Sequence, residues 1–228
     1  MSIVRNLEEI QTRIFRASRK VGCNPDSVTL VAVSKTVPVS RIEEAIAAGV
    51  EVLGENRVQE ARQKIASIGK KIPWHLIGHL QTNKASLAVS LFEMVQSVDS
   101  LRVAEALERE AGKREKRLPV LVQVNISGET SKSGVAADEA PDLIEAVAGM
   151  PHLQLQGLMT IPPYSADPES GRPIYRRLRE LRDRVNAEGL IGTPMTHLSM
   201  GMSHDFEVAV EEGATMVRVG TLLFGERR

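Results

Sequence analysis

The sequence has almost no cysteine, no excess charge of either sign and no long hydrophobic run. Cys23 is the single cysteine in 228 residues, which excludes an internal disulfide and zinc sites built on two or four cysteines. The 29 basic and 29 acidic side chains balance, so the electrostatic footprint of a general nucleic-acid binder is missing. No apolar run approaches the roughly 18 residues needed to span a bilayer. The opening segment, MSIVRNLEEIQTRIF, also lacks the unbroken apolar stretch of a signal peptide. We therefore expect a cytoplasmic, globular protein with neither nucleic-acid nor membrane partners.

Short β-branched runs alternate with helical stretches along the chain. Eight runs predict strands, at residues 28–33, 50–53, 74–78, 94–98, 119–126, 153–160, 195–199 and 215–220. Between them lie segments with apolar residues at spacings of three and four, such as 41–49, 55–69, 100–113 and 141–150. Strand, helix and strand in succession predict parallel pairing with right-handed crossovers. Eight such units favour an α/β fold with a single (β/α)8 TIM-type barrel over residues 1–228, rather than an open doubly wound sheet.

The last strand is followed by too few residues for a full covering helix, since only GTLLFGERR remains. An extra N-terminal helix at about residues 2–20 is predicted to cover this seam of the barrel. Its apolar residues are expected on one side: Ile3, Leu7, Ile10, Ile14 and Phe15. The Pro-rich stretch 161–173 predicts a long loop, either a lid or an ordinary surface loop.

Lys35 is the first candidate for chemistry. Functional residues of such barrels lie at the carboxyl ends of the strands, and Lys35 follows the apolar run LVAV with only Ser34 between them. Partial burial disfavours the charged ammonium form, which turns a lysine into a nucleophile able to form an imine with an aldehyde. The alternative is an ordinary exposed lysine in the first strand-to-helix loop.

The loops after the seventh and eighth strands, SMGMS and GTLLFG, predict an anion site. Each places glycine, with serine or threonine alongside, just before helical sequence, and these loops form the usual phosphate site of such barrels. Glycines that only make tight turns are the alternative. A phosphate site beside a nucleophilic lysine suggests a phosphorylated aldehyde as the ligand.

Arg218 shares a strand face with Met216 and Gly220 by alternation. A guanidinium is too costly to bury without a partner, so it must meet a ligand or a carboxylate. We expect either a ligand acceptor or a structural ion pair with Glu55 or Glu226.

Several segments together resemble the pyridoxal phosphate homeostasis proteins, single-domain relatives of the N-terminal barrel of alanine racemase. They are VAVSKTVP, LGENRVQE, WHLIGHLQTNK, QVNIS, SKSG, GLMTIPP and HLSMGMSHDFEVAVEEGATMVRVGTLLFG, and they cover nearly the whole chain in order. The resemblance implies that Lys35 carries pyridoxal 5′-phosphate as an internal aldimine and that Arg218 faces the pyridine nitrogen. It places the remaining residues around the phosphate (Ser199, Gly201, Gly220 and Thr221), beside the ring (Asn56) and in the pocket lining (His79, Met159 and Met200).

Two lysine positions qualify this resemblance. The family often has a second lysine two residues after the first, and this chain has Val37 there. Lys132, in the SKSG segment, matches the family; it either exchanges the cofactor with Lys35 or is a solvated loop lysine. The resemblance suggests pyridoxal-dependent apoenzymes as recipients of the cofactor. We expect a monomer, because no unusually apolar helix argues for a dimer.

Chain length and residue types argue against catalytic turnover. The second domain of alanine racemase, which supplies a tyrosine base, has no room in 228 residues, and the chain has only Tyr164 and Tyr175. An arginine beside the ring nitrogen also disfavours its protonation. We expect a binding protein without a catalytic residue. A single-domain racemase or lyase using the same cofactor is the alternative, and a phosphosugar isomerase or aldolase is a more distant one.

The histidines give weaker signals. His75 and His79 would lie about 13 Å apart on a strand, so no metal site is predicted there. His204 and Asp205 are typical of helix-capping and surface residues rather than of an acid/base pair.

Overall fold

Eight parallel strands form a closed ring in the computed structural model, which describes residues 2–129 and 132–225. They are β1 (Thr29–Val33), β2 (Val52–Glu55), β3 (Trp74–Leu76), β4 (Met94–Val98), β5 (Leu118–Asn125), β7 (Leu153–Met159), β8 (His197–Met202) and β9 (Met216–Val219). Each strand pairs with the next in this order, and β9 pairs with β1 to close the ring. The predicted barrel and its eight strands are confirmed. A two-residue strand that the sequence did not predict, β6 (Val135–Ala136), adds to β5 outside the ring.

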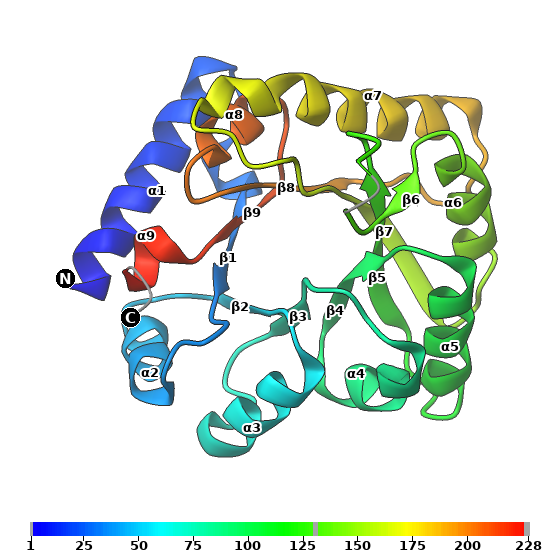
Figure 1. The fold of residues 1–228 in the computed structure, drawn as a ribbon, viewed down its shortest axis with the longest axis horizontal. Helices are drawn as coiled ribbons and strands as arrows, with labels where there is room; N and C mark the ends of the chain where they lie inside the picture. The colour runs from blue at the N-terminus through cyan, green and yellow to red at the C-terminus, as the bar shows by residue number, and fades with distance from the viewer. Residues whose placement is uncertain (1, 130–131, 226–228) are drawn as a thin grey trace.

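Helices surround the ring (Figure 1). They are α1 (Ile3–Lys20), α2 (Val39–Ala47), α3 (Val58–Ile68), α4 (Ala85–Leu91), α5 (Leu101–Gly112), α6 (Ala140–Ala148), α7 (Arg172–Glu188), α8 (Phe206–Glu211) and α9 (Thr221–Phe224). Short 3₁₀ turns are η1 (Pro25–Ser27), η2 (Thr82–Lys84) and η3 (Pro168–Gly171). No helix within the described ranges is long and apolar enough to cross a membrane.

Strand alternation divides the core into two layers. In β1, Ala32 points outward into the large apolar layer between strands and helices, whereas Val31 and Val33 point into the barrel. The smaller interior cluster contains Val31, Val33, Val52, Ile77, Met94, Leu121, Met159 and Met216. Because this cluster occupies the barrel interior, we look for a ligand site at the carboxyl-terminal mouth, where the sites of such barrels lie.

The N-terminal helix covers the seam left by the short α9, as predicted. Figure 1 shows α1 (blue) beside α8 (orange) and α9 (red), and Asn6 Nδ2 donates to the carbonyl oxygen of Leu223 at 2.9 Å. The predicted stripe Ile3, Leu7, Ile10 and Ile14 is buried. The prediction for Phe15 is wrong, because its side chain is 53% exposed. Consecutive helical residues point about 100° apart, so Phe15 cannot share the face of Ile14.

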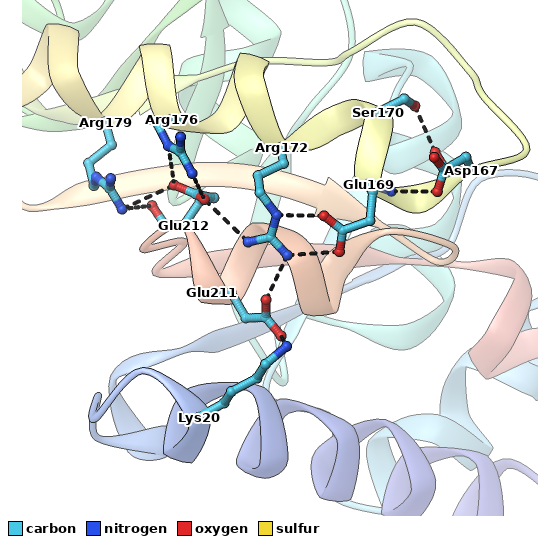
Figure 2. Close-up of polar contacts among 9 residues, drawn as sticks. All are labelled: Lys20, Asp167, Glu169, Ser170, Arg172, Arg176, Arg179, Glu211 and Glu212. Atoms are coloured by element: carbon cyan, nitrogen blue, oxygen red, sulfur yellow. Dashed lines mark hydrogen bonds and ion pairs between the residues drawn. The ribbon is translucent and has the colours of Figure 1, made fainter.

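A network of charged side chains fastens the end of the Pro-rich loop to the neighbouring helices (Figure 2). Arg172, at the start of α7, donates two hydrogen bonds to Glu169 of η3 and one to Glu211 of α8. Glu211 also accepts from Lys20 of α1 at 2.7 Å. Glu212 is paired with three arginines of α7: Arg172, Arg176 and Arg179. These ion pairs therefore hold the end of the loop that leads into α7 against α8.

Candidate functional site

A cavity of about 250 Å³ opens at the carboxyl ends of β1, β2, β8 and β9. It is lined by Val33, Lys35, Asn56, Ile77, Ile161, Tyr164, Met202, Ser203, His204, Arg218, Gly220 and Thr221. Five of the residues predicted for the site therefore meet in it: Lys35, Asn56, Arg218, Gly220 and Thr221. They lie far apart in the sequence, and the parallel barrel brings them together because all its strands end on the same face.

Lys35 lies between two cavities. It lies in the turn that follows β1, two residues after Val33, and its side chain is half-buried. A second cavity of about 280 Å³ shares Val33, Lys35, Gly220 and Thr221 with the first and extends toward Arg41 of α2 and Phe224 of α9. The first strand-to-helix loop thus places its lysine in the lining of both cavities.

Arg218 is buried, and within the described residues its two hydrogen bonds go to neutral groups. Nη1 donates to Ser199 Oγ at 2.5 Å, and Nη2 donates to the Thr160 carbonyl oxygen at 2.8 Å. The predicted ion pair with Glu55 is wrong, because Glu55 pairs with Lys64 instead; Glu226 lies outside the described residues. Burial lowers the pKa of Arg218 to about 10, so the guanidinium remains charged at neutral pH.

Behind Arg218, polar side chains continue into the barrel. Ser199 Oγ donates to Gln96 Oε1 at 2.6 Å, and Gln96 Nε2 lies 2.9 Å from His75 Nδ1. Burial, with a smaller contribution from His197, lowers the pKa of His75 to about 4. His75 is therefore neutral at ordinary pH, and its Nδ1 accepts the hydrogen bond from the Gln96 amide. This chain of neutral groups holds Arg218 in place.

Strand β8 approaches α8 very closely near its end, at Gly201, where φ is +89°. A Cβ atom there would lie 2.5 Å from Ala209 Cβ and 2.9 Å from Phe206 Cα, so only glycine fits. Two residues later, Ser203 Oγ accepts a hydrogen bond from the Gly220 amide at 3.3 Å. This bond ties together the two glycine-containing loops that the sequence pointed to.

Asp205 is buried, so the prediction that it is a surface residue is wrong. Its Oδ2 accepts from the Tyr175 hydroxyl at 2.7 Å, and its Oδ1 accepts from the Met202 amide at 2.7 Å. His204 Nε2 lies 3.5 Å from the same Oδ2. Burial and the negative charge of Asp205 raise the pKa of Tyr175, which is therefore a hydrogen-bond donor at neutral pH. Asp205 thus fixes the loop that carries Met202, Ser203 and His204 along the cavity.

The other residues predicted for the site lie away from the cavity lining. His79 Nδ1 lies 2.8 Å from Asp99 Oδ2, beside a separate cavity of about 400 Å³. Met159 belongs to the interior apolar cluster, whereas Met200 points outward into the layer beneath the helices. Neither Ser199 nor Gly201 lines the cavity: Ser199 is hydrogen-bonded to Arg218, and Gly201 packs against α8. Lys132 lines another cavity, of about 640 Å³, together with Asn125 and Arg177.

Seven residues of the cavity lining were not among the predicted site residues: Val33, Ile77, Ile161, Tyr164, Met202, Ser203 and His204. The Tyr164 side chain is 80% exposed, and its ring centroid lies 5.3 Å from that of His204. Ser203 could have been found, because it is the last residue of the SMGMS segment that predicted the anion site. No cluster of three His, Cys, Asp or Glu side chains suited to a metal ion occurs in the described parts of the chain.

Comparisons with known proteins agree with this architecture. The family described as "Alanine racemase, N-terminal domain" matches residues 5–228. The chain is 43% identical to the pyridoxal phosphate homeostasis protein of Aquifex aeolicus (strain VF5), with 100% of both chains covered. Among solved structures, PipY of Synechococcus elongatus PCC7942 with PLP bound matches with a TM-score of 0.86 and 35% identity, covering 98% of this chain and 100% of that one. An alanine racemase of Clostridium difficile 630 matches at 16% identity with a TM-score of 0.75, covering 99% of this chain and 57% of the racemase, and this likeness shows the fold alone.

Proposed function

Because the chain belongs to the pyridoxal phosphate homeostasis protein family, we propose that it binds pyridoxal 5′-phosphate covalently through Lys35 and stores or hands over this molecule without turning over a substrate. The observation that carries the proposal is the meeting of Lys35 and the buried Arg218 in one cavity at the barrel mouth. The PLP-bound structure of PipY, a relative that matches over its full length, supports the choice of ligand.

The residues present fit this ligand. Pyridoxal 5′-phosphate supplies an aldehyde, which condenses reversibly with a neutral amine and releases one water molecule. The amine would be that of Lys35, and the buried Arg218 guanidinium, whose hydrogen-bond partners among the described residues are Ser199 and the Thr160 carbonyl, suits a ring nitrogen acting as acceptor. Asn56 would lie beside the ring. The backbone at Gly220 and the hydroxyl groups of Thr221 and Ser203 would hold the phosphate.

The polar groups at the mouth support storage rather than turnover. The fixed charge of Arg218 disfavours protonation of a ring nitrogen, which weakens the electron sink that pyridoxal enzymes need. Tyr175 is bound to Asp205 with a raised pKa, and Tyr164 is largely exposed, so neither is poised as a base opposite Lys35. We propose pyridoxal-dependent apoenzymes as the recipients.

The test is spectroscopic. Adding pyridoxal 5′-phosphate to the purified protein should produce an imine absorption band, and borohydride should trap the ligand on the peptide that contains Lys35. Lys35→Ala should lose the band while its far-UV circular dichroism stays unchanged. Lys132→Ala, in a different cavity, is the matched control and should keep the band. An unchanged band in Lys35→Ala would reject Lys35 as the anchor.

A racemase or lyase is the competing function, since Tyr164 and His204 are titratable groups in the cavity lining. Exchange of the α-proton into deuterated water, measured across a panel of amino acids, distinguishes the two. We expect no exchange above that of free pyridoxal 5′-phosphate. Rapid exchange that disappears in Lys35→Ala would favour the enzyme.

A further inference from the structure

Three charged side chains gather behind the loop that carries Lys35. Glu55 ends β2 with a fully buried side chain, and Glu60 and Lys64 lie one turn apart on α3. Lys64 Nζ lies 2.6 Å from Glu55 Oε1 and 2.7 Å from Glu60 Oε1. The Lys64 side chain is only 9% exposed. None of the three belongs to the lining of the candidate cavity.

This cluster is bonded to both neighbours of Lys35. On one side, Lys64 Nζ donates to the Ser34 carbonyl oxygen at 2.6 Å, and Ser34 Oγ donates to Glu55 Oε1 at 2.8 Å. On the other side, the Thr36 amide donates to Glu60 Oε1 at 2.6 Å. The peptide groups before and after Lys35 are thus held by charge-assisted hydrogen bonds, which are the stronger kind.

The backbone at Thr36 shows that this loop is constrained. Its φ is +63°, in the left-handed region that a β-branched residue rarely adopts. Such a conformation persists only where the surroundings determine it, and the bond from the Thr36 amide to Glu60 is one such determinant.

We propose that Glu55, Glu60 and Lys64 form a positioning cluster that fixes the Lys35 backbone, so that its amine is held where it can attack an aldehyde in the cavity. Buried ion pairs are a poor source of net stability, because desolvation offsets their attraction. Hydrogen bonds to named backbone atoms on both sides of one residue do fix geometry. The proposal rests on the proposed function for the identity of the aldehyde, but its claim about the lysine can be tested separately.

Glu60 offers the cleanest variant, because its removal leaves the buried Glu55–Lys64 pair in place. Glu60→Ala should slow imine formation at Lys35 with pyridoxal 5′-phosphate about tenfold, since small misplacements of a reacting group have effects of this size or larger. Glu60→Gln keeps an oxygen that can accept from the Thr36 amide and should recover most of the rate. A purely stabilising role for Glu60 would predict normal rates in every variant that folds.

Glu110→Ala is the matched control. Glu110 also pairs with a basic residue four positions later, Arg114, but on the surface of α5. It should react at the wild-type rate. A Glu60→Ala rate equal to that of Glu110→Ala, with circular dichroism unchanged in both, would overturn the proposal.

Two further measurements keep the test decisive. Competitive acetylation compares Lys35 with Lys132 by peptide mass spectrometry and needs no pyridoxal ligand; relative labelling of Lys35 should change in Glu60→Ala and not in Glu110→Ala. If wild type forms no imine, the proposed function fails, while this labelling still decides the positioning role. In wild-type protein, the Thr36 amide resonance should shift as Glu60 titrates, below the ordinary pKa of a glutamate. If the Thr36 amide resonance does not shift in this pH range, the proposed role of the cluster is wrong, even if the variants do not fold.

Discussion

The Ser199 hydroxyl accepts a hydrogen bond from Arg218 and donates one to Gln96. These two bonds connect the mouth of the barrel to its polar interior. The phosphate role that family resemblance suggests for Ser199 remains a prediction, and the structure adds this second, observable role. Arg218 depends on Ser199 for one of its two hydrogen bonds.

Ser199→Ala should therefore destabilise the protein and loosen Arg218. The substitution leaves a buried guanidinium N–H and a buried amide oxygen without their partner, which typically costs about 1–3 kcal/mol. Urea unfolding should show a lower midpoint. Ser67→Ala, on the exposed face of α3, should leave the midpoint unchanged. Equal midpoints for the two variants would contradict this role of Ser199.

The neutral state of His75 predicts a pH dependence of stability. Folded His75 stays neutral down to about pH 4, whereas in the unfolded chain it takes up a proton below the ordinary histidine pKa of 6.5. Between these values the unfolded state binds more protons, so the contribution is complete above pH 6.5 and is lost as the pH falls toward 4. Above pH 6.5 this effect contributes about 3 kcal/mol to the free energy of unfolding.

His75→Asn removes this titration and keeps an oxygen near the position of Nδ1. Urea unfolding of both proteins from pH 4.5 to 8 should show the wild type losing stability relative to the variant as the pH falls. Curves that run parallel over this range would mean that His75 is not a neutral buried group.

Tyr175→Phe should weaken the loop that lines the cavity. The hydroxyl of Tyr175 donates to Asp205, and its loss leaves a buried carboxylate with one partner fewer, at a cost of roughly 1–3 kcal/mol. Thermal unfolding should show a lower midpoint. Tyr164→Phe removes an exposed hydroxyl and is the control, expected to unfold like the wild type. If Asp205→Asn makes the Tyr175→Phe substitution neutral, the two effects share this bond; additive effects would speak against it.

Gly78→Ala should disturb the site through Asn56. A Cβ atom on Gly78 would lie 2.3 Å from the Asn56 carbonyl oxygen and 2.7 Å from its Cα, so the backbone of a cavity residue must move. Overpacking of this kind costs about 1–3 kcal/mol. The variant should bind pyridoxal 5′-phosphate more weakly in a spectroscopic titration. Gly192→Ala, where a Cβ meets open space, is the control, and equal affinities would show that Asn56 does not contribute.

The barrel could be predicted from sequence because its signals are local. Strand runs and helical spacing each depend on a few neighbouring residues, and the stripe Ile3, Leu7, Ile10 and Ile14 identified the helix that covers the seam. The prediction for Phe15 was wrong because it placed two adjacent helical residues, Ile14 and Phe15, on one face. The short β6 was not predicted, because two residues are too few to show strand alternation.

The candidate site was only partly predictable, because side-chain direction depends on distant elements. Lys35, Asn56 and Arg218 follow or belong to strands whose alternation was clear, and they meet in the cavity. Along β8 the pairing with β9 shifts between Ser199 and Met202, so the mouth is lined by Met202 and Ser203 rather than Met200. The burial of Asp205 depends on Tyr175, which lies 30 residues away and gives no local sign of the contact.

The closure of the seam by α1 also sets the order in which the chain can finish folding. The apolar stripe of α1 leaves the ribosome well before α8 and α9, against which it packs, as the 217-residue separation of the Asn6–Leu223 hydrogen bond illustrates. During synthesis that stripe stays uncovered until α8 and α9 emerge. Nascent chains stalled before residue 206 should therefore depend on chaperones far more than the finished protein does.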